Sequence, residues 1–148
     1  MKSRFAVALL LAAALGCGEA PTPEQEVRAV LAALEAAAEA GQAGDFSDLV
    51  SARYEDAEGH DREQLRAFVA FHVMQSGRGR ELIVRVRDLR FPEPERASVT
   101  LAVGLAGASS RFSADVDVYA VDMDLAREGD GWRVRWAQWR PAPATDLL

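Results

Sequence analysis

The chain has very little cysteine, lysine or histidine. Its 148 residues contain one cysteine, Cys17, and two histidines, so neither an internal disulfide nor a site of several cysteine and histidine ligands can form. The only lysine is Lys2, and 23 acidic residues outnumber 17 basic ones. The net charge of −6 argues against nucleic acid as a partner. No catalytic, nucleotide or metal motif stands out, so we assign no catalytic residue, metal ligand or cofactor.

The sequence also lacks an apolar run long enough to span a bilayer. The longest extends from Phe5 to Leu15, about half of the roughly twenty residues that a spanning helix needs. Lys2 and Arg4 precede it, which is the order of a signal peptide. The residues that follow, Ala14-Leu15-Gly16-Cys17, resemble the lipobox of bacterial lipoproteins. An ordinary secretory signal with an incidental cysteine is the alternative.

The lipobox resemblance implies a location and a modification. It predicts a signal peptide over 1–16, cleavage between Gly16 and Cys17, and attachment of acyl chains such as palmitate to Cys17. Gly18 follows instead of the aspartate that retains such proteins at the inner membrane, so we expect the periplasmic face of the outer membrane of a Gram-negative cell envelope. The tether over 17–21 spans only about 14 Å beyond the cysteine. It therefore keeps the domain, and any partner, close to the membrane.

Three helices are predicted in the first half of the domain. Thr22, Pro23 and Gln25 form a helix start with a capping box, Asp45 is expected to cap a short second helix, and Asp61 a third. The apolar positions at helical spacing are Val27, Val30, Leu31 and Leu34, then Phe46, Leu49 and Val50, then Leu65, Phe68, Val69, His72 and Val73.

From Glu81 the apolar period changes to two, which predicts strands. We expect four, over 81–91, 97–105, 112–125 and 132–140, and phase slips inside them indicate β-bulges that bend the sheet. The sequence thus predicts an α+β domain over 22–140. In it, three N-terminal helices pack in the concave face of a strongly curved antiparallel four-stranded sheet. Residues 141–148 are expected to form a flexible tail.

This order of elements resembles a known fold. Residues 49–56 and 59–65 look like its passage from the second helix into the third, and Asp130-Gly131-Trp132-Arg133-Val134 looks like its closing strand. The family is the nuclear transport factor 2-like (NTF2-like), or SnoaL-like, fold, a cone of sheet around helices. The resemblance implies an interior that can hold a pocket and a sheet that can form a homodimer. Members include isomerases, dehydratases, transport adaptors and lipoproteins, so the fold does not fix the function.

Six residues are candidates for the lining of that pocket: Tyr54, Phe68, His72, Tyr119, Trp132 and Trp136. Trp139, beyond the last expected phase slip, is predicted to be exposed. His72 is either a general base near neutral pH or a core histidine with a hydrogen-bond partner.

Two polar groups of residues have structural readings. Asp56, Glu58, His60 and Asp61 form either a metal clip or, as the spacing favours, a polar turn in which Asp61 caps the helix. The alternating strand aspartates are expected to point away from the core and to pair with Arg133 and Arg135. The aspartates in question are Asp115, Asp117, Asp122 and Asp124.

Three functions remain open on the sequence. The leading hypothesis is a non-enzymatic lipoprotein whose cone binds an apolar small ligand or whose sheet binds an envelope protein. The second is an isomerase, dehydratase or hydrolase that uses His72. The third is a structural or inhibitory interaction module with a filled cone. An open or a packed interior separates the first from the third.

Overall fold

A computed structural model describes residues 18–76, 81–106 and 116–148. Gly16 and Cys17, with the rest of the predicted signal peptide, lie outside the described residues. So do the side chains of residues 72–76, 81, 106 and 116.

The two long helices follow the sequence pattern closely. The helices are α1 (Pro23–Glu39), α2 (Ala43–Asp48) and α3 (Arg62–Ser76). The prediction that Asp45 caps the short second helix is wrong, because that helix begins at Ala43 and Asp45 lies within its first turn. Thr22 and Gln25 form the predicted capping box at the start of α1. Asp61 and Gln64 exchange side-chain hydrogen bonds with each other's backbone N–H at the start of α3, at 2.9 Å each. Local capping chemistry therefore sets where both long helices begin.

The sheet has five strands rather than the four expected. They are β1 (Val50–Asp56), β2 (Glu81–Glu93), β3 (Arg96–Ala106), β4 (Val116–Glu128) and β5 (Gly131–Pro141), in the spatial order β1-β5-β4-β3-β2. The pairs from β2 to β5 are antiparallel, whereas β1 runs parallel to β5. Val50, expected in the second helix, begins β1 instead. The short segment has no apolar alternation, and its only partner strand comes much later in the chain.

Register shifts interrupt the strand pairings at four places in the described sheet, and two of them bear on the sequence predictions. One lies between Val86 and Asp88 on β2, where the sequence predicted a phase slip. The other lies between Val134 and Trp136 on β5, opposite Asp124 and Leu125 of β4. A bulge reverses which side chains face the core. The shift on β5 therefore exchanges the faces that regular alternation predicts for Trp136 and Trp139.

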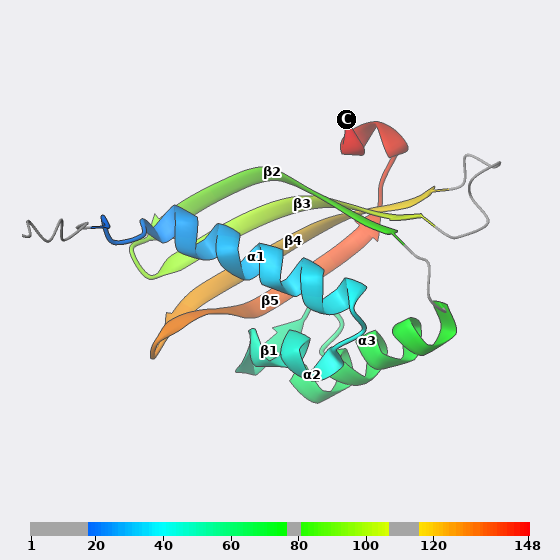
Figure 1. Ribbon diagram of the computed structural model, residues 1–148, viewed down its shortest axis with the longest axis horizontal. Coiled ribbons are helices and arrows are strands. Elements are labelled where there is room, and N and C mark those ends of the chain that lie inside the picture. Colours follow the sequence, from blue (N-terminus) through cyan, green and yellow to red (C-terminus); the bar gives the residue numbers. More distant parts are fainter. Residues whose placement is uncertain (1–17, 77–80, 107–115) are drawn as a thin grey trace, which may run out of the picture.

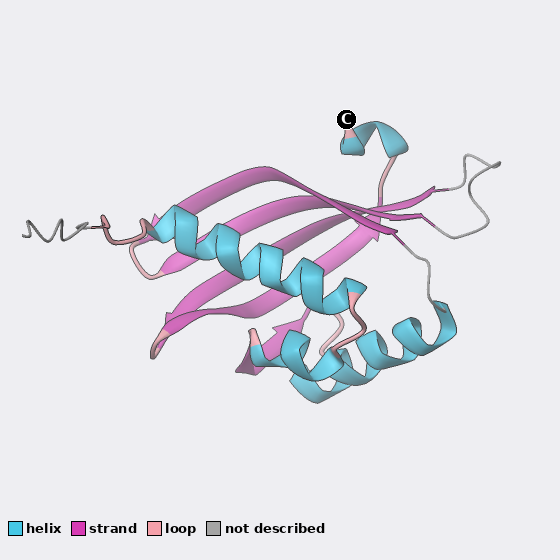
Figure 2. Ribbon diagram, viewed as in Figure 1, coloured by secondary structure: helices cyan, strands magenta, loops and turns pink. Residues whose placement is uncertain are grey.

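The three helices lie on one face of the sheet, with α1 running along it (Figure 1). Figure 2 shows the same two-layer arrangement by secondary structure. The core between α1 and the sheet contains Val27, Leu31, Leu125, Trp132 and Val134, all buried. Within the described ranges, none of the helices combines the length and the apolar character needed to cross a membrane.

The C-terminal segment is more ordered than the flexible tail that the sequence suggested. β5 extends to Pro141, and Ala144–Leu147 form a 3-10 helix, η1. The Arg87 guanidinium donates hydrogen bonds to the carbonyl oxygens of Asp146 and Leu148, each at 3.2 Å. Ala142 also donates its N–H to the Val118 carbonyl. These contacts tie the end of the chain to β2 and β4.

Candidate functional site

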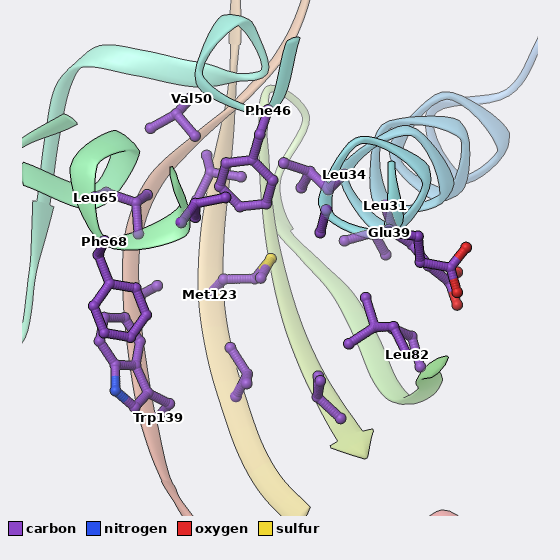
Figure 3. Close-up of a pocket in the computed structure, with 18 of the residues that line it drawn as sticks. Leu31, Leu34, Glu39, Phe46, Val50, Leu65, Phe68, Leu82, Met123 and Trp139 are labelled. Atoms are coloured by element: carbon purple, nitrogen blue, oxygen red, sulfur yellow. The ribbon is translucent and has the colours of Figure 1, made fainter. Parts of the chain in front are cut away.

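A cavity of about 650 Å³ lies between the helices and the concave face of the sheet (Figure 3). Pockets that hold small molecules typically occupy about 300–1,000 Å³. Its walls come from the second half of α1, from α2 and α3, and from all five strands. The lining includes Leu31, Leu34, Phe46, Val50, Leu65, Phe68, Val69, Leu82, Val84, Val103, Leu105, Val121, Met123, Val134, Ala137 and Trp139.

Aliphatic and aromatic carbon forms most of this surface. The rings of Phe68 on α3 and Trp139 on β5 stack with centroids 6.1 Å apart, and Figure 3 shows them together on one side of the pocket. Glu39 and Leu82 lie on the opposite side. Met123 lies between the two sides, on β4. The cavity thus extends across the sheet from the β5 side towards β2.

Four lining residues carry ionisable groups: Glu35, Glu39, Tyr54 and Tyr119. Tyr54 is 3% exposed, and its hydroxyl oxygen is fully enclosed and has no hydrogen-bond partner among the described residues. Burial raises the pKa of the Tyr54 phenol well above its usual range, and the nearby charge of Asp56 adds to the shift. Tyr54 is therefore a neutral phenol at physiological pH.

Tyr54, Phe68 and Tyr119 line the cavity, but the two tryptophans predicted to line it, Trp132 and Trp136, do not. Trp132 is 1% exposed and belongs to the packed core near the start of α1. Trp136 follows the bulge in β5, which puts it out of phase with the lining residues Ala137 and Trp139.

The prediction that Trp132 and Trp136 line the pocket is therefore wrong for both residues. Trp139 is 36% exposed, yet it forms part of the wall. The side chain of His72 lies outside the described residues.

The segment after β1 is a polar turn. The Asp56 carboxylate, buried within it, accepts hydrogen bonds from the backbone N–H groups of Glu58 and His60 and lies 2.9 Å from His60 Nδ1. Burial opposes ionisation, but these hydrogen bonds prevail and hold the pKa of Asp56 below its usual range. No group of three or more candidate metal ligands exists within the described ranges.

The opposite face of the sheet is polar. Asp122 accepts hydrogen bonds from Thr100, Gln138 and Arg140, which together lower its pKa, Arg140 most of all. Ser98 donates to Asp124 at 2.6 Å. Asp122 and Asp124 thus face away from the core as expected, and Asp115 lies outside the described residues. The expectation is wrong for Asp117, which pairs with Leu105 and so shares the side of β4 that carries Tyr119 and Val121.

The arginine partners predicted for the strand aspartates are wrong. Arg133 pairs with Asp130 within its own turn, and Arg135 with Glu128. The bulge in β5 displaces Arg135 from the regular ladder, so Arg140 takes the position beside Asp122.

The described lining of the cavity is mainly apolar. Among the described lining residues there is no basic side chain, and the two carboxylates, Glu35 and Glu39, are on one helix. A cavity of this kind supplies a large transfer free energy to an apolar molecule, about 25 cal/mol for each Å² removed from water.

The residues predicted to line the pocket included aromatic side chains of its wall but none of its aliphatic side chains. Leu82, Val84, Val103, Leu105 and Val121 alternate along β2, β3 and β4, and the period of two already places them on the inner face. The pattern gives the face, but not that the helices leave it partly uncovered.

Comparison of the sequence with protein-family models and with curated proteins finds no match. Solved structures do match. One is a domain of unknown function with a cystatin-like fold from Nostoc punctiforme: TM-score 0.67, 16% identity, 82% of this chain and 78% of that one covered. A scytalone dehydratase-like protein from Novosphingobium aromaticivorans gives a TM-score of 0.68 at 10% identity, with 81% and 84% covered.

A third structure shares this architecture. It is an NTF2-like protein of unknown function from Shewanella oneidensis, with a TM-score of 0.65, 13% identity, and 80% of this chain and 98% of that one covered. At these identities the likeness concerns the fold and leaves the activity open. By the arrangement of its helices and curved sheet, the chain has the NTF2-like, or cystatin-like, fold.

Proposed function

We propose that this protein is a lipid-anchored envelope protein whose NTF2-like domain binds an apolar small molecule in the cavity, without catalysis. The single observation that carries the proposal is the cavity itself, about 650 Å³ of space enclosed mainly by apolar side chains. A filled cone would have favoured a purely structural module. The open interior favours ligand binding.

The composition of the wall supports binding rather than catalysis. General acid–base catalysis needs a titratable group within hydrogen-bond reach of the reacting atom. The enclosed hydroxyl of Tyr54 and the carboxylates of Glu35 and Glu39, on the second half of α1, provide no such pair at the centre of the described lining.

The anchor rests on the sequence around Cys17. A positive n-region, a short apolar run and the lipobox-like residues 14–17 support cleavage before Cys17 and its acylation. Two or more acyl chains give stable anchoring, because each buried methylene contributes about 0.8 kcal/mol. A tether of a few residues then places the cavity within reach of lipids and of molecules dissolved in them.

Ligand binding is tested with N-phenyl-1-naphthylamine, a neutral apolar dye that fluoresces in a dry environment. We expect the domain from residue 18 onward to bind it, and Val84→Trp to abolish binding by filling the cavity. Arg85→Trp is the matched control, because the adjacent side chain is exposed on the other face of β2.

Loss of dye binding in Val84→Trp alone, with unchanged circular dichroism in both variants, supports the proposal. Equal binding by the two variants would contradict it. Lipids that copurify with the native protein, extracted and identified by mass spectrometry, then point to the natural ligand.

The anchor is tested separately by metabolic labelling with radioactive palmitate. We expect label on the wild-type chain and none on Cys17→Ala, because Cys17 is the only thiol. Label on neither chain would overturn the anchor and leave the cavity proposal standing.

A further inference from the structure

The charged side chains of the described cavity lining are all of one sign. Glu35 and Glu39 are the charged residues of the described lining, and both come from the last turns of α1. Neither forms an ion pair within the described part of the chain, and both are at least partly exposed to solvent. Their negative charges are therefore available to a ligand.

The backbone of α1 adds to this negative field. Ala38, Ala40 and Gly41 also line the cavity, so the C-terminal end of the helix lies at its wall. A helix C-terminus carries the equivalent of about half a negative charge and favours cations within its last turn. Basic residues often occupy that turn, yet α1 has none there.

The two sides of the cavity differ in character. Figure 3 shows Glu39 on the same side of the pocket as Leu31 and Leu82, across from Phe68 and Trp139. A molecule that fills the space would thus place its apolar body against β3, β4 and β5. One end of it would lie at the acidic end of α1.

We propose that the ligand is a cationic amphiphile: an apolar body inside the cavity and an amine or quaternary ammonium group at the C-terminal end of α1. The inference rests on the proposed function and specifies its ligand class. Fatty acids and other anionic lipids are disfavoured, because their head groups would meet the carboxylates of Glu35 and Glu39 and the negative end of the helix.

The test uses four ligands with the same twelve-carbon chain: dodecyltrimethylammonium, dodecylamine, dodecanol and dodecanoate. Each displaces N-phenyl-1-naphthylamine from the domain at low ionic strength, below the concentration at which it forms micelles. We expect both cations to bind about tenfold more tightly than dodecanol, the effect of two carboxylates in high dielectric, and dodecanoate to bind more weakly than the alcohol.

The double variant Glu35→Gln/Glu39→Gln should remove most of the preference for cations and leave the affinity for dodecanol unchanged. Glu24→Gln is the control for position, since it removes one negative charge from the other end of α1, where Glu24 pairs with Arg28 at 2.9 Å. Added salt should weaken the preference in the wild type, because it screens exposed charges.

Three results would overturn the inference: equal binding of cation and anion by the wild type, an unchanged preference in the double variant, or an equal effect of Glu24→Gln. Failure of the proposed function looks different. In that case neither the dye nor dodecanol binds the wild type at all.

Discussion

The two ends of α1 face the same sheet but meet different surroundings. Near the start, the side chain of Trp132 fills the space beneath the helix and is 1% exposed. Near the end, smaller side chains leave the cavity open. One large aromatic side chain therefore accounts for much of the difference between a closed and an open end of the cone.

The acidic residues of the helix differ in the same way. At the closed end, the Glu26 carboxylate accepts hydrogen bonds from Arg127 and from Trp132 Nε1, the latter at 3.0 Å. The Arg127 guanidinium also lies 4.9 Å from the centre of the Trp132 ring. At the open end, Glu35 and Glu39 have no such partners among the described residues. Side-chain hydrogen bonds therefore fix the start of α1 to the sheet, and no equivalent contact holds its end among the described residues.

The largest expected effect comes from two tryptophans of β5: Trp132, at the closed end of the cone, and Trp139, at the open end. Trp132→Ala should lower the free energy of unfolding by about 3–5 kcal/mol, because it leaves a large void in a packed core. Trp139→Ala should lower it by only about 1 kcal/mol, since that side chain is 36% exposed beside an existing cavity. Urea unfolding measures both.

If the two tryptophan variants lose the same free energy of unfolding, the distinction between a closed and an open end does not hold. Binding of the neutral dye tests the same distinction a second time. Trp139→Ala should weaken dye binding, because it removes part of the wall, whereas Trp132→Ala should alter dye binding less wherever the variant still folds.

The sequence was sufficient for the two long helices, for four of the strands and for the phase slip on β2. Thr22 and Asp61 carry local capping signals, and the slip between Val86 and Leu89 is visible as a change of phase. β1 was not predicted, because a parallel pairing with a distant strand leaves little local pattern in the sequence. The slip that the sequence places before Trp139 lies between Val134 and Trp136 in the structure. Trp136 is apolar and follows Val134 at a spacing of two, so the sequence does not show on which side of the slip it falls.

The candidate site was only partly accessible to the same reasoning. Tyr54, Phe68 and Tyr119 were placed in the lining from their positions in helix and strand patterns, and the aliphatic wall follows from the period of two. Whether space remains between the layers depends on the volumes of side chains from three helices and five strands. A local sequence pattern does not give the total volume of those side chains.

A smaller effect is expected from the carboxylate at the closed end. The hydrogen bond from Arg127, and then that from Trp132, hold the pKa of Glu26 below its usual range. Folding therefore gains stability from this group above the unfolded-state pKa of about 4.3, and loses that gain as the pH falls through the lower folded-state value.

Glu26→Gln should accordingly unfold at a lower temperature than the wild type at pH 7, with the difference shrinking on acidification below pH ~4. Thermal unfolding followed by circular dichroism at several pH values measures it. Glu24→Gln is the control on the same helix, and a comparable pH-dependent loss there would remove the special role of Glu26.

The smallest effect concerns the enclosed hydroxyl of Tyr54. Tyr54→Phe removes a buried polar oxygen that has no partner among the described residues. We expect the free energy of unfolding to stay the same or rise, by no more than about 1 kcal/mol, because a buried unpaired group opposes folding. Tyr119→Phe is the matched control. A clear loss of stability in Tyr54→Phe would show that the hydroxyl is hydrogen-bonded in solution.

The parallel pairing of β1 with β5 has a consequence for how the chain reaches its final form. Val50 pairs with Val134, so one edge of the sheet is completed only after the last strand is in place. Contacts between such distant parts of a chain form late and slowly. Until β5 is in place, β1 would lack this partner, so Val50 and Tyr54 would stay exposed and the cavity that both residues line would be incomplete.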